Sequence, residues 1–286
     1  MRFAIATADR YLGVFEAFTR AAWKPLKLFS MPVANTIDHH NAVVAFAEQH
    51  HAAIQLSRIT EHDMFELREQ KCDALIVACY SWHIGNWQPF LKYAVNFHSS
   101  PLPDGRGPYP VHRAILENRS SWAITCHRLA HEFDKGDILA AENFLLQPDE
   151  CHESLDLKIQ IAANRLAAKV AGQFIELWGK ATPQVGGSYW PKHTLQDRIV
   201  DFQKPVESIM RQIRAFGATE SLVNINNTWL VVKRALGWPE QHNYAPGKVL
   251  HVYNRTIVVA ALDGYIGLLE PDIVRPEIAA KLQEKN

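Results

Sequence analysis

Three polar residues in this chain are of the types that stabilise a transient oxyanion: Asn96, His98 and Asp134. Asn96 and His98 are two positions apart in an apolar, strand-like run, and alternate residues of a strand point to the same side of a sheet. An amide N–H beside a titratable ring suits stabilisation of negative charge that develops on a carbonyl oxygen under attack. A carboxylate such as Asp134 would orient the ring and raise its pKa. We therefore predict that these three side chains form a catalytic site.

The elements that would position these residues alternate between short apolar runs and helical patterns. Strands are expected at 2–6, 26–32, 52–56, 73–79 and 94–98, and helices at 12–23, 37–50, 63–69 and 110–118. This alternation predicts an α/β fold built on an open, mostly parallel sheet. Ligands of such sheets bind beyond the carboxyl ends of the strands, and Asn96 and His98 fall at such an end.

The second half of the chain changes character. Two more strands are expected at 122–130 and 138–146, then one long helix at 153–178 and a Pro- and Gly-rich linker within 182–192. After a helix at 206–216, short strands at 228–233, 247–252, 256–261 and 265–269 predict a smaller β-barrel. We therefore predict a catalytic domain at 1–188, a linker at 189–203 and a C-terminal domain at 204–286.

The composition favours a soluble protein with reduced cysteines, as is typical of the cytoplasm. The 286 residues are 48% hydrophobic, enough for a large and a small core, and 30 basic residues balance 30 acidic ones, which argues against a broad nucleic-acid footprint. The longest apolar runs are far shorter than the roughly 18 residues that span a bilayer, and no signal peptide is expected. Cys72, Cys79, Cys126 and Cys151 lack zinc-site spacing. No metal is predicted, because Asp38, next to two histidines, is more simply a helix cap.

A family resemblance rests on three ordered motifs: Asn96-Phe-His98-Ser-Ser-Pro-Leu-Pro103, then Arg106-Gly107, then Phe133-Asp134-Lys-Gly136. These motifs resemble those of the 10-formyltetrahydrofolate-dependent formyltransferases. Later segments resemble the junction and C-terminal domain of the methionyl-tRNA formyltransferase branch: 189–192, 201–202, 213–215 and 246–247. The resemblance covers the whole chain. It implies a Rossmann-like catalytic domain followed by a smaller OB-like barrel.

The resemblance also implies a co-substrate, 10-formyltetrahydrofolate, in a cleft beside the three polar residues, and no metal. Three loops would contact the folate, with side chains at Tyr80 and Trp82, at Ser100, Pro101, Leu102 and Pro103, and at His131 and Phe133. Pro101 departs from the leucine usual in the family. In the implied reaction an amine attacks the formyl carbon, Asn96 donates a hydrogen bond to the resulting oxyanion, and His98 stabilises the charge or passes a proton.

The acceptor is expected to be a primary amine of a small metabolite, either an amino sugar or an amino-acid-like molecule. The tRNA-specific branch carries a long basic insertion where this chain has residues 30–39, which contain neither Lys nor Arg. From Lys204 onward the charges are nearly balanced, whereas phosphate contacts supply most non-specific nucleic-acid affinity. Three alternatives remain: formylation of initiator Met-tRNA, hydrolysis of the formyl donor, and a non-catalytic folate- or RNA-binding module. Neither a membrane partner nor an oligomeric state is predicted.

Overall fold

The computed structural model describes residues 1–32 and 39–283, which form two compact units that are each discontinuous in sequence. The N-terminal unit comprises Met1–Pro110, Ser121–Leu145 and Leu157–Trp190. The C-terminal unit comprises Val111–Ser120, Leu146–Asp156 and the chain from Pro191 onward. The domain boundaries expected at residues 188 and 203 describe independently folding domains, and they remain a prediction.

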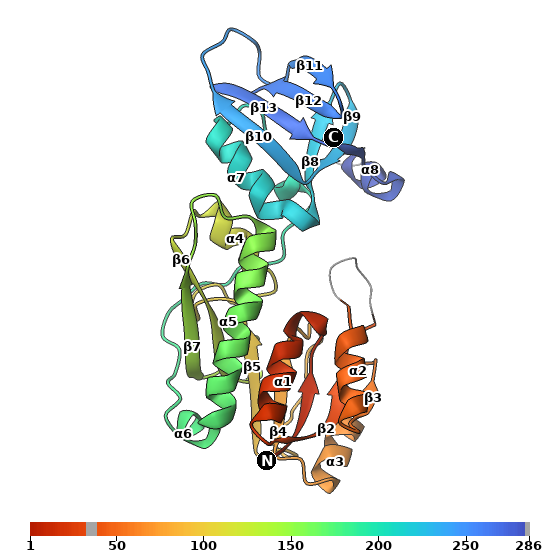
Figure 1. Ribbon diagram of the computed structural model, residues 1–286, viewed down its shortest axis with the longest axis vertical. Coiled ribbons are helices and arrows are strands. Elements are labelled where there is room, and N and C mark those ends of the chain that lie inside the picture. Colours follow the sequence, from red (N-terminus) through yellow and green to blue (C-terminus); the bar gives the residue numbers. More distant parts are fainter. Residues whose placement is uncertain (33–38, 284–286) are drawn as a thin grey trace. The chain divides into compact units, whose positions relative to one another are not determined.

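The N-terminal unit is built on a seven-stranded sheet in the order β3-β2-β1-β4-β5-β6-β7 (Figure 1). The strands are β1 (Arg2–Ala6), β2 (Lys24–Phe29), β3 (Ala53–Gln55), β4 (Ala74–Ala78), β5 (Tyr93–His98), β6 (Ser121–Arg128) and β7 (Ile138–Leu145). The first five strands pair in parallel, and β6 and β7 add two antiparallel pairs at one edge. The predicted Rossmann-like, mostly parallel fold is confirmed.

Helices cover both faces of this sheet. They are α1 (Leu12–Arg20), α2 (Asn41–Gln49), α3 (Glu61–Glu69), the part of α5 (His152–Gly172) from Leu157 onward, and α6 (Phe174–Gly179). Helix α4 (Pro110–Leu116) belongs, from Val111 onward, to the C-terminal unit. On one face, the Phe15 and Phe18 rings of α1 pack against Phe3 of β1. On the other face, Met64 and Leu67 of α3 belong to a buried cluster with neighbouring residues of β1 and β4. Strands that are covered on both faces bury apolar side chains on both sides, and this is why β4, and β1 after Arg2, appear in the sequence as hydrophobic runs.

The helices expected at 37–50 and 153–178 differ most from the observed ones. Helix α2 begins at Asn41, and residues 37 and 38 of the expected helix lie outside the described residues. The Asp9 carboxylate accepts a hydrogen bond from the Val43 backbone N–H in the first turn of α2, at 2.8 Å. The single helix expected at 153–178 is broken into α5 and α6 just after Gly172, a residue type with low helix propensity.

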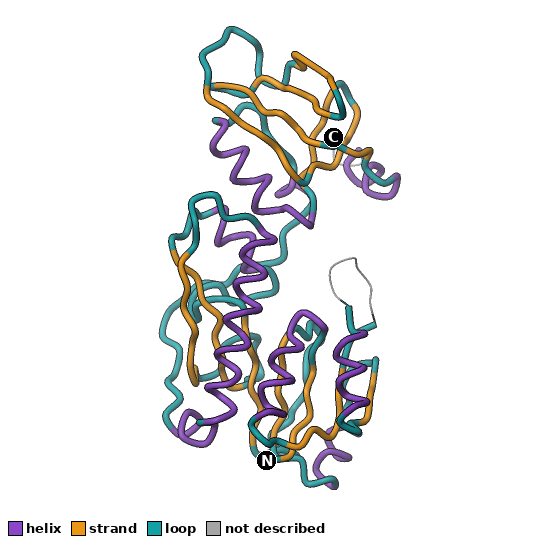
Figure 2. The backbone as a smooth tube through the Cα atoms, viewed as in Figure 1, coloured by secondary structure: helices purple, strands orange, loops and turns teal. Residues whose placement is uncertain are grey.

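The C-terminal unit, predicted as a small β-barrel, is built from two antiparallel sheets, whose strands are drawn in orange in Figure 2. One sheet has the order β10-β13-β12-β11 and the other β14-β9-β8, with strands β8 (Ser221–Ile225), β9 (Thr228–Val232), β10 (Arg234–Pro239), β11 (Val249–Tyr253), β12 (Thr256–Ala260), β13 (Gly264–Leu269) and β14 (Asp272–Ile273). Helix α7 (Val206–Phe216) has the predicted bounds and contributes Ile209 and Ile213 to the core of this unit. Helix α8 (Pro276–Gln283) and three 3-10 turns, Asp9–Tyr11, Gln196–Arg198 and Gly217–Thr219, complete the described chain.

Candidate active site

Asn96 and His98 lie side by side at the carboxyl end of β5. Strand alternation places both on the face of Ala94, which is fully buried in the apolar cluster beneath α3. The same face of the strand is therefore apolar at its start and polar at its end. The apolar start holds β5 in the core, and the polar end presents Asn96 and His98 at the carboxyl ends of the strands, where a doubly wound fold binds its ligands.

Asp134 is brought to the same place by the turn that joins β6 to β7. Its Oδ1 lies 3.4 Å from Nδ1 of His98 and 3.3 Å from Nδ2 of Asn96. The turn is tight: Asp134 adopts a left-handed backbone with φ of 57°, and a Cβ on Gly136 would lie 1.8 Å from the Arg128 carbonyl oxygen. Only glycine fits at that second position. The three residues predicted from the sequence therefore meet.

His127 is a fourth member of the cluster that the sequence reasoning missed. The antiparallel register of β5 and β6 places it directly opposite Asn96, with its Nε2 3.1 Å from the Asn96 Nδ2. Its Nδ1 lies 2.8 Å from the Arg128 carbonyl oxygen, which can only accept, so Nδ1 carries the proton and Nε2 accepts from the amide. The signal that would have found His127 is the strand register, which the sequence does not display.

The contacts of Asn96 restrict its predicted role. One amide N–H is directed at His127 and the other at Asp134, so both donors are engaged within the cluster. The Asp134 contact is the longer of the two, at 3.3 Å against 3.1 Å. This is therefore the hydrogen bond that an incoming oxyanion would replace.

Burial and charge act in opposite directions on His98. The side chain of His98 is 10% exposed and that of Asp134 is 9% exposed. Burial lowers the pKa of His98 below 6.5, although the Asp134 charge and the Gly105 carbonyl pull it upward. Asp134 does raise the pKa of His98, as predicted, but desolvation of the imidazolium is the larger effect, so the net pKa is lowered. The His98 ring is therefore neutral near pH 7.

The hydrogen bond of His98 decides which of its nitrogens can accept a proton. Nε2 lies 2.9 Å from the Gly105 carbonyl oxygen, so the neutral ring carries its proton there. Nδ1 is then the basic nitrogen, and it faces Asp134. Burial raises the pKa of Asp134, but the nearby His127 and His98 rings and the Gly107 N–H outweigh burial and hold it at about 2. An ionised carboxylate thus stands ready to stabilise an imidazolium.

The segment from Gln184 to Trp190, here called the strap, was expected to belong to a linker, and the structure corrects this. The backbone N–H of Arg106 donates to the Ser188 carbonyl, and that of Trp190 donates to the Arg106 carbonyl, at 3.0 and 2.7 Å. The Trp190 indole stacks on Trp122 at 5.7 Å. Gly187, one of the residues that suggested a linker, instead allows close packing: a Cβ there would lie 2.1 Å from the Pro103 carbonyl oxygen.

In the predicted folate loop at residues 100–103, two side chains point inward and two are partly exposed. Ser100 is fully buried and its hydroxyl donates to the Asp104 carbonyl at 2.9 Å, while Leu102 is 8% exposed. These two side chains shape the loop from inside. Pro101 and Pro103 are partly exposed.

The other two predicted folate loops approach one another through His83. Its Nε2 lies 3.3 Å from the His131 carbonyl oxygen, and its ring lies 5.4 Å from that of Phe133, which is 56% exposed. In the first loop, the Tyr80 and Trp82 rings contact edge to face at 5.6 Å. The predicted aromatic residues therefore line two neighbouring loops.

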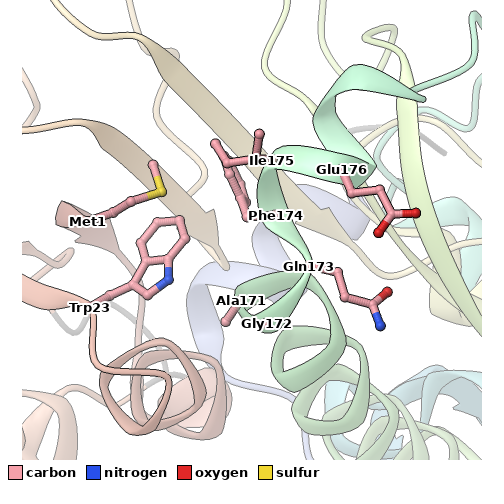
Figure 3. Close-up of a pocket in the computed structure, with 8 residues that line it drawn as sticks. All are labelled: Met1, Trp23, Ala171, Gly172, Gln173, Phe174, Ile175 and Glu176. Atoms are coloured by element: carbon pink, nitrogen blue, oxygen red, sulfur yellow. The ribbon is translucent and has the colours of Figure 1, made fainter.

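Other features of the described chain lie apart from this cluster. A cavity of about 300 Å³ is lined by Met1, Trp23 and residues 171–176 (Figure 3). Met1 immediately precedes β1, so this cavity lies at the amino ends of the parallel strands, away from His98. Within residues 1–32 and 39–283, no cluster of His, Cys, Asp and Glu is arranged to hold a metal ion, and no helix is long and apolar enough to cross a membrane.

Comparison with known proteins finds relatives of this chain among the formyltransferases. A methionyl-tRNA formyltransferase of Coprothermobacter proteolyticus is 36% identical over 152 residues, which cover 51% of this chain and 49% of that protein. The chain thus spans about half the length of that relative. A methionyl-tRNA formyltransferase of Variovorax paradoxus is 26% identical over 283 residues, covering 96% of this chain and 86% of that protein.

A solved N-formyltransferase of Helicobacter canadensis, in complex with folinic acid and dTDP-3-aminofucose, shares the fold with a TM-score of 0.70 at 16% identity. The match covers 94% of this chain and 98% of that one. Two family models match consecutive parts of the sequence: formyl transferase over residues 28–170, and the formyl transferase C-terminal domain over residues 192–277. The chain therefore belongs to the formyl transferase family.

Proposed function

We propose that the protein transfers a formyl group from 10-formyltetrahydrofolate to a primary amine of a small metabolite, an amino sugar or an amino-acid-like molecule. The observation that carries the proposal is the contact of His98 with Asp134 beside Asn96, in a chain of the formyl transferase family. A module that only bound folate would not require a buried base, a carboxylate and an amide in mutual contact. The proposed catalytic residues are Asn96, His98 and Asp134.

The protonation states suggest how these residues act. The amine nitrogen attacks the formyl carbon, and Nδ1 of His98, neutral because the ring is buried, takes a proton from that nitrogen. Asp134 stabilises the resulting imidazolium across 3.4 Å. Asn96 exchanges its hydrogen bond to Asp134 for one to the oxyanion. The bond between the formyl carbon and N10 of the folate then breaks, and the proton passes to N10.

The folate donor is proposed to bind between the loops that carry Tyr80, Trp82, His131 and Phe133 and the loop of Pro101 and Pro103. Exposed or partly exposed rings on neighbouring loops suit a flat pterin. The complex of the Helicobacter canadensis protein with folinic acid supports a folate as the donor. No metal is part of the proposal.

The choice of a small acceptor over tRNA rests on charge. Several cations of the C-terminal unit lie within 4.0 Å of an acid: Arg211 with Glu207, Lys233 with Glu220, Arg234 with Glu270 and Arg255 with Asp272. Cations already paired with acids are poorly suited to gripping a phosphate backbone. The dTDP-3-aminofucose in the Helicobacter canadensis complex also supports an amino sugar.

Formylation of initiator Met-tRNA is the second candidate. The names of the Coprothermobacter and Variovorax relatives favour it, and the Variovorax match extends over nearly the whole chain. We place either activity in the cytoplasm, because none of the four cysteines forms a disulfide, as is usual in a reducing compartment.

An acceptor panel tests the proposal. Purified protein is given 10-formyltetrahydrofolate with nucleotide-linked amino sugars, with amino acids, with charged initiator tRNA, or with no acceptor, and donor loss and product mass are measured. We expect formylation of a small amine and none with the His98→Ala protein. Formylated Met-tRNA would establish the second candidate, rapid formate release without acceptor would indicate a hydrolase, and donor stability throughout would refute formyl transfer.

A further inference from the structure

Gln184 is the side chain of the strap that touches both loops around the candidate catalytic carboxylate. Its amide Nε2 donates to the carbonyl oxygens of Asp134 and Gly136, at 2.7 and 2.8 Å. Its Oε1 accepts from Nε of Arg106 at 2.9 Å. The Gln184 amide thus donates both of its N–H groups to the turn that carries Asp134. Its oxygen accepts from Arg106 in the facing loop.

The loop on the other side of this bridge supplies the remaining contacts of the cluster. The Gly107 backbone N–H donates to Oδ2 of Asp134 at 3.0 Å, and the Gly105 carbonyl accepts from His98 at 2.9 Å. Arg106, between the two glycines, also donates to the Gly186 carbonyl at 2.7 Å. Two loops therefore set the distance between the His98 ring and the Asp134 carboxylate. These loops are linked by the Gly107–Asp134 hydrogen bond and by the Gln184 side chain.

We propose that Gln184 is a positioning residue for the reaction, and that it acts by holding the Asp134 turn in register with the Gly105–Gly107 loop. The inference rests on the proposed function. Gln184 touches no reacting atom. It holds the Asp134 carboxylate in place by its hydrogen bond to the Asp134 backbone carbonyl. A carboxylate displaced by about 1 Å stabilises the imidazolium less well, and misplacement of that size costs up to about a hundredfold in rate.

Two substitutions separate the parts of this bridge. Gln184→Met keeps the length of the side chain and removes all three hydrogen bonds. Gln184→Glu keeps an acceptor for Arg106 but replaces both N–H donors by an oxygen that faces two carbonyl oxygens. If the donors to the Asp134 turn matter, both variants are impaired; if only the Arg106 contact matters, Gln184→Glu is active. Val185→Ala is the matched control, because Val185 is the next residue of the strap and is 86% exposed.

Two measurements are made on each protein. In the acceptor assay, we expect kcat of Gln184→Met and Gln184→Glu to fall about 10- to 100-fold with the KM of the donor within about twofold of wild type. In an NMR titration of the histidine rings, we expect the His98 midpoint of Gln184→Met to move to lower pH, because a displaced Asp134 attracts the imidazolium less. Val185→Ala should change neither value.

Unchanged kcat together with an unchanged His98 midpoint in a folded Gln184→Met protein would overturn the proposal and leave Gln184 a structural residue. The NMR titration needs no turnover, so it tests the positioning role even if the proposed reaction is wrong. Should Gln184→Met fail to fold, Arg106→Lys weakens the same bridge from its other side. That protein must then show both changes in the same direction, or the proposal fails.

Discussion

Asn96 on β5 and His127 on β6 stand directly opposite one another across an antiparallel pair, with the amide nitrogen of one 3.1 Å from Nε2 of the other. This pair lies where the sheet changes from parallel to antiparallel pairing. His127 is 1% exposed and accepts from the amide, so it fixes the orientation in which Asn96 presents its second N–H to Asp134. The orientation of a candidate oxyanion donor is thus set by the neighbouring strand.

Replacing His127 by leucine tests this arrangement. The substitution leaves one buried N–H of Asn96 without its acceptor, which lowers the free energy of unfolding by about 1–3 kcal/mol. We expect kcat for formyl transfer to fall about 5- to 100-fold in a protein that still folds. Cys126→Ala is the control, because Cys126 is the adjacent residue of β6 and points to the opposite face of the sheet. Equal rates for the two variants would show that His127 does not serve the reaction.

Removal of the proposed base or its carboxylate should abolish most turnover. For His98→Ala and for Asp134→Ala we expect kcat to fall at least about 10²-fold, the usual cost of losing one group that stabilises the developing charge. Circular dichroism should show a retained fold. A well-folded His98→Ala protein with wild-type turnover would remove this residue from the mechanism.

The lowered pKa of His98 predicts the acid limb of the pH profile. Nδ1 must be unprotonated to take a proton, so kcat/KM should fall with decreasing pH through a midpoint below 6.5, the ordinary value. Asp134 raises the His98 pKa, so the midpoint of the fall in kcat/KM should lie at a still lower pH in the Asp134→Asn protein. Profiles of both proteins with one acceptor make the comparison, because the titration of the acceptor is then common to both. A midpoint that moves upward would contradict the assignment.

Gly136 should not tolerate a side chain. An alanine Cβ there would lie 1.8 Å from the Arg128 carbonyl oxygen, so the turn must shift and carry Asp134 with it. We expect Gly136→Ala to lower kcat about 10²-fold and to lower the melting temperature. Gly85→Ala is the control, since a Cβ at Gly85 would have no atom within 4 Å. Full activity of Gly136→Ala would mean that the turn can relax without moving the carboxylate.

The Lys27–Asp63 pair should contribute to stability rather than activity. Nζ of Lys27 lies 2.8 Å from Asp63, with side-chain exposures of 11% and 7%. We expect Lys27→Met to lower the free energy of unfolding by between about 1 and about 3 kcal/mol, between the values for exposed and buried pairs. Lys24→Met, on the same strand but exposed, should have little effect. Equal losses in urea titrations would contradict the role of the pair.

The same carboxylate gives the stability a pH dependence. Burial raises the pKa of Asp63, but hydrogen bonds from Lys27, Thr60 and Gln55 outweigh it and hold the pKa well below 3.8. The contribution is therefore complete above pH 3.8 and is lost as the pH falls below that value. In Lys27→Met, where one of these hydrogen bonds is missing, the loss on acidification should be smaller.

The sequence predicted the parts of the site that follow from strand alternation and ordered motifs. Asn96 and His98 could be placed together because one strand carries both, and Asp134 because its motif has a family spacing. His127 could not be placed, since its partner is fixed by the register between two strands. Gln184 was assigned to a linker because nearby glycines are typical of flexible segments, although Gly187 in fact allows close packing against Pro103.

The elements that the sequence reasoning missed are short or interrupted. Strand β8 has five residues and ends at an Asn-Asn turn, and β10 contains Gly237 and Pro239, both of which weaken a strand pattern. Their pairing partners β9 and β13 were predicted, and tertiary pairing is what makes β8 and β10 strands.

The discontinuity of the C-terminal unit affects how it could be exchanged between relatives. His112 and His152 precede the long Pro191–Asn286 part of this unit, yet the two rings lie 4.9 Å apart, and His112 contacts the Phe216 ring and the Thr219 hydroxyl, at 5.1 and 3.0 Å. A chimaera joined near residue 190 would pair these two histidines with foreign neighbours. To transplant the unit intact, the chimaera must also include its two upstream segments, Val111–Ser120 and Leu146–Asp156.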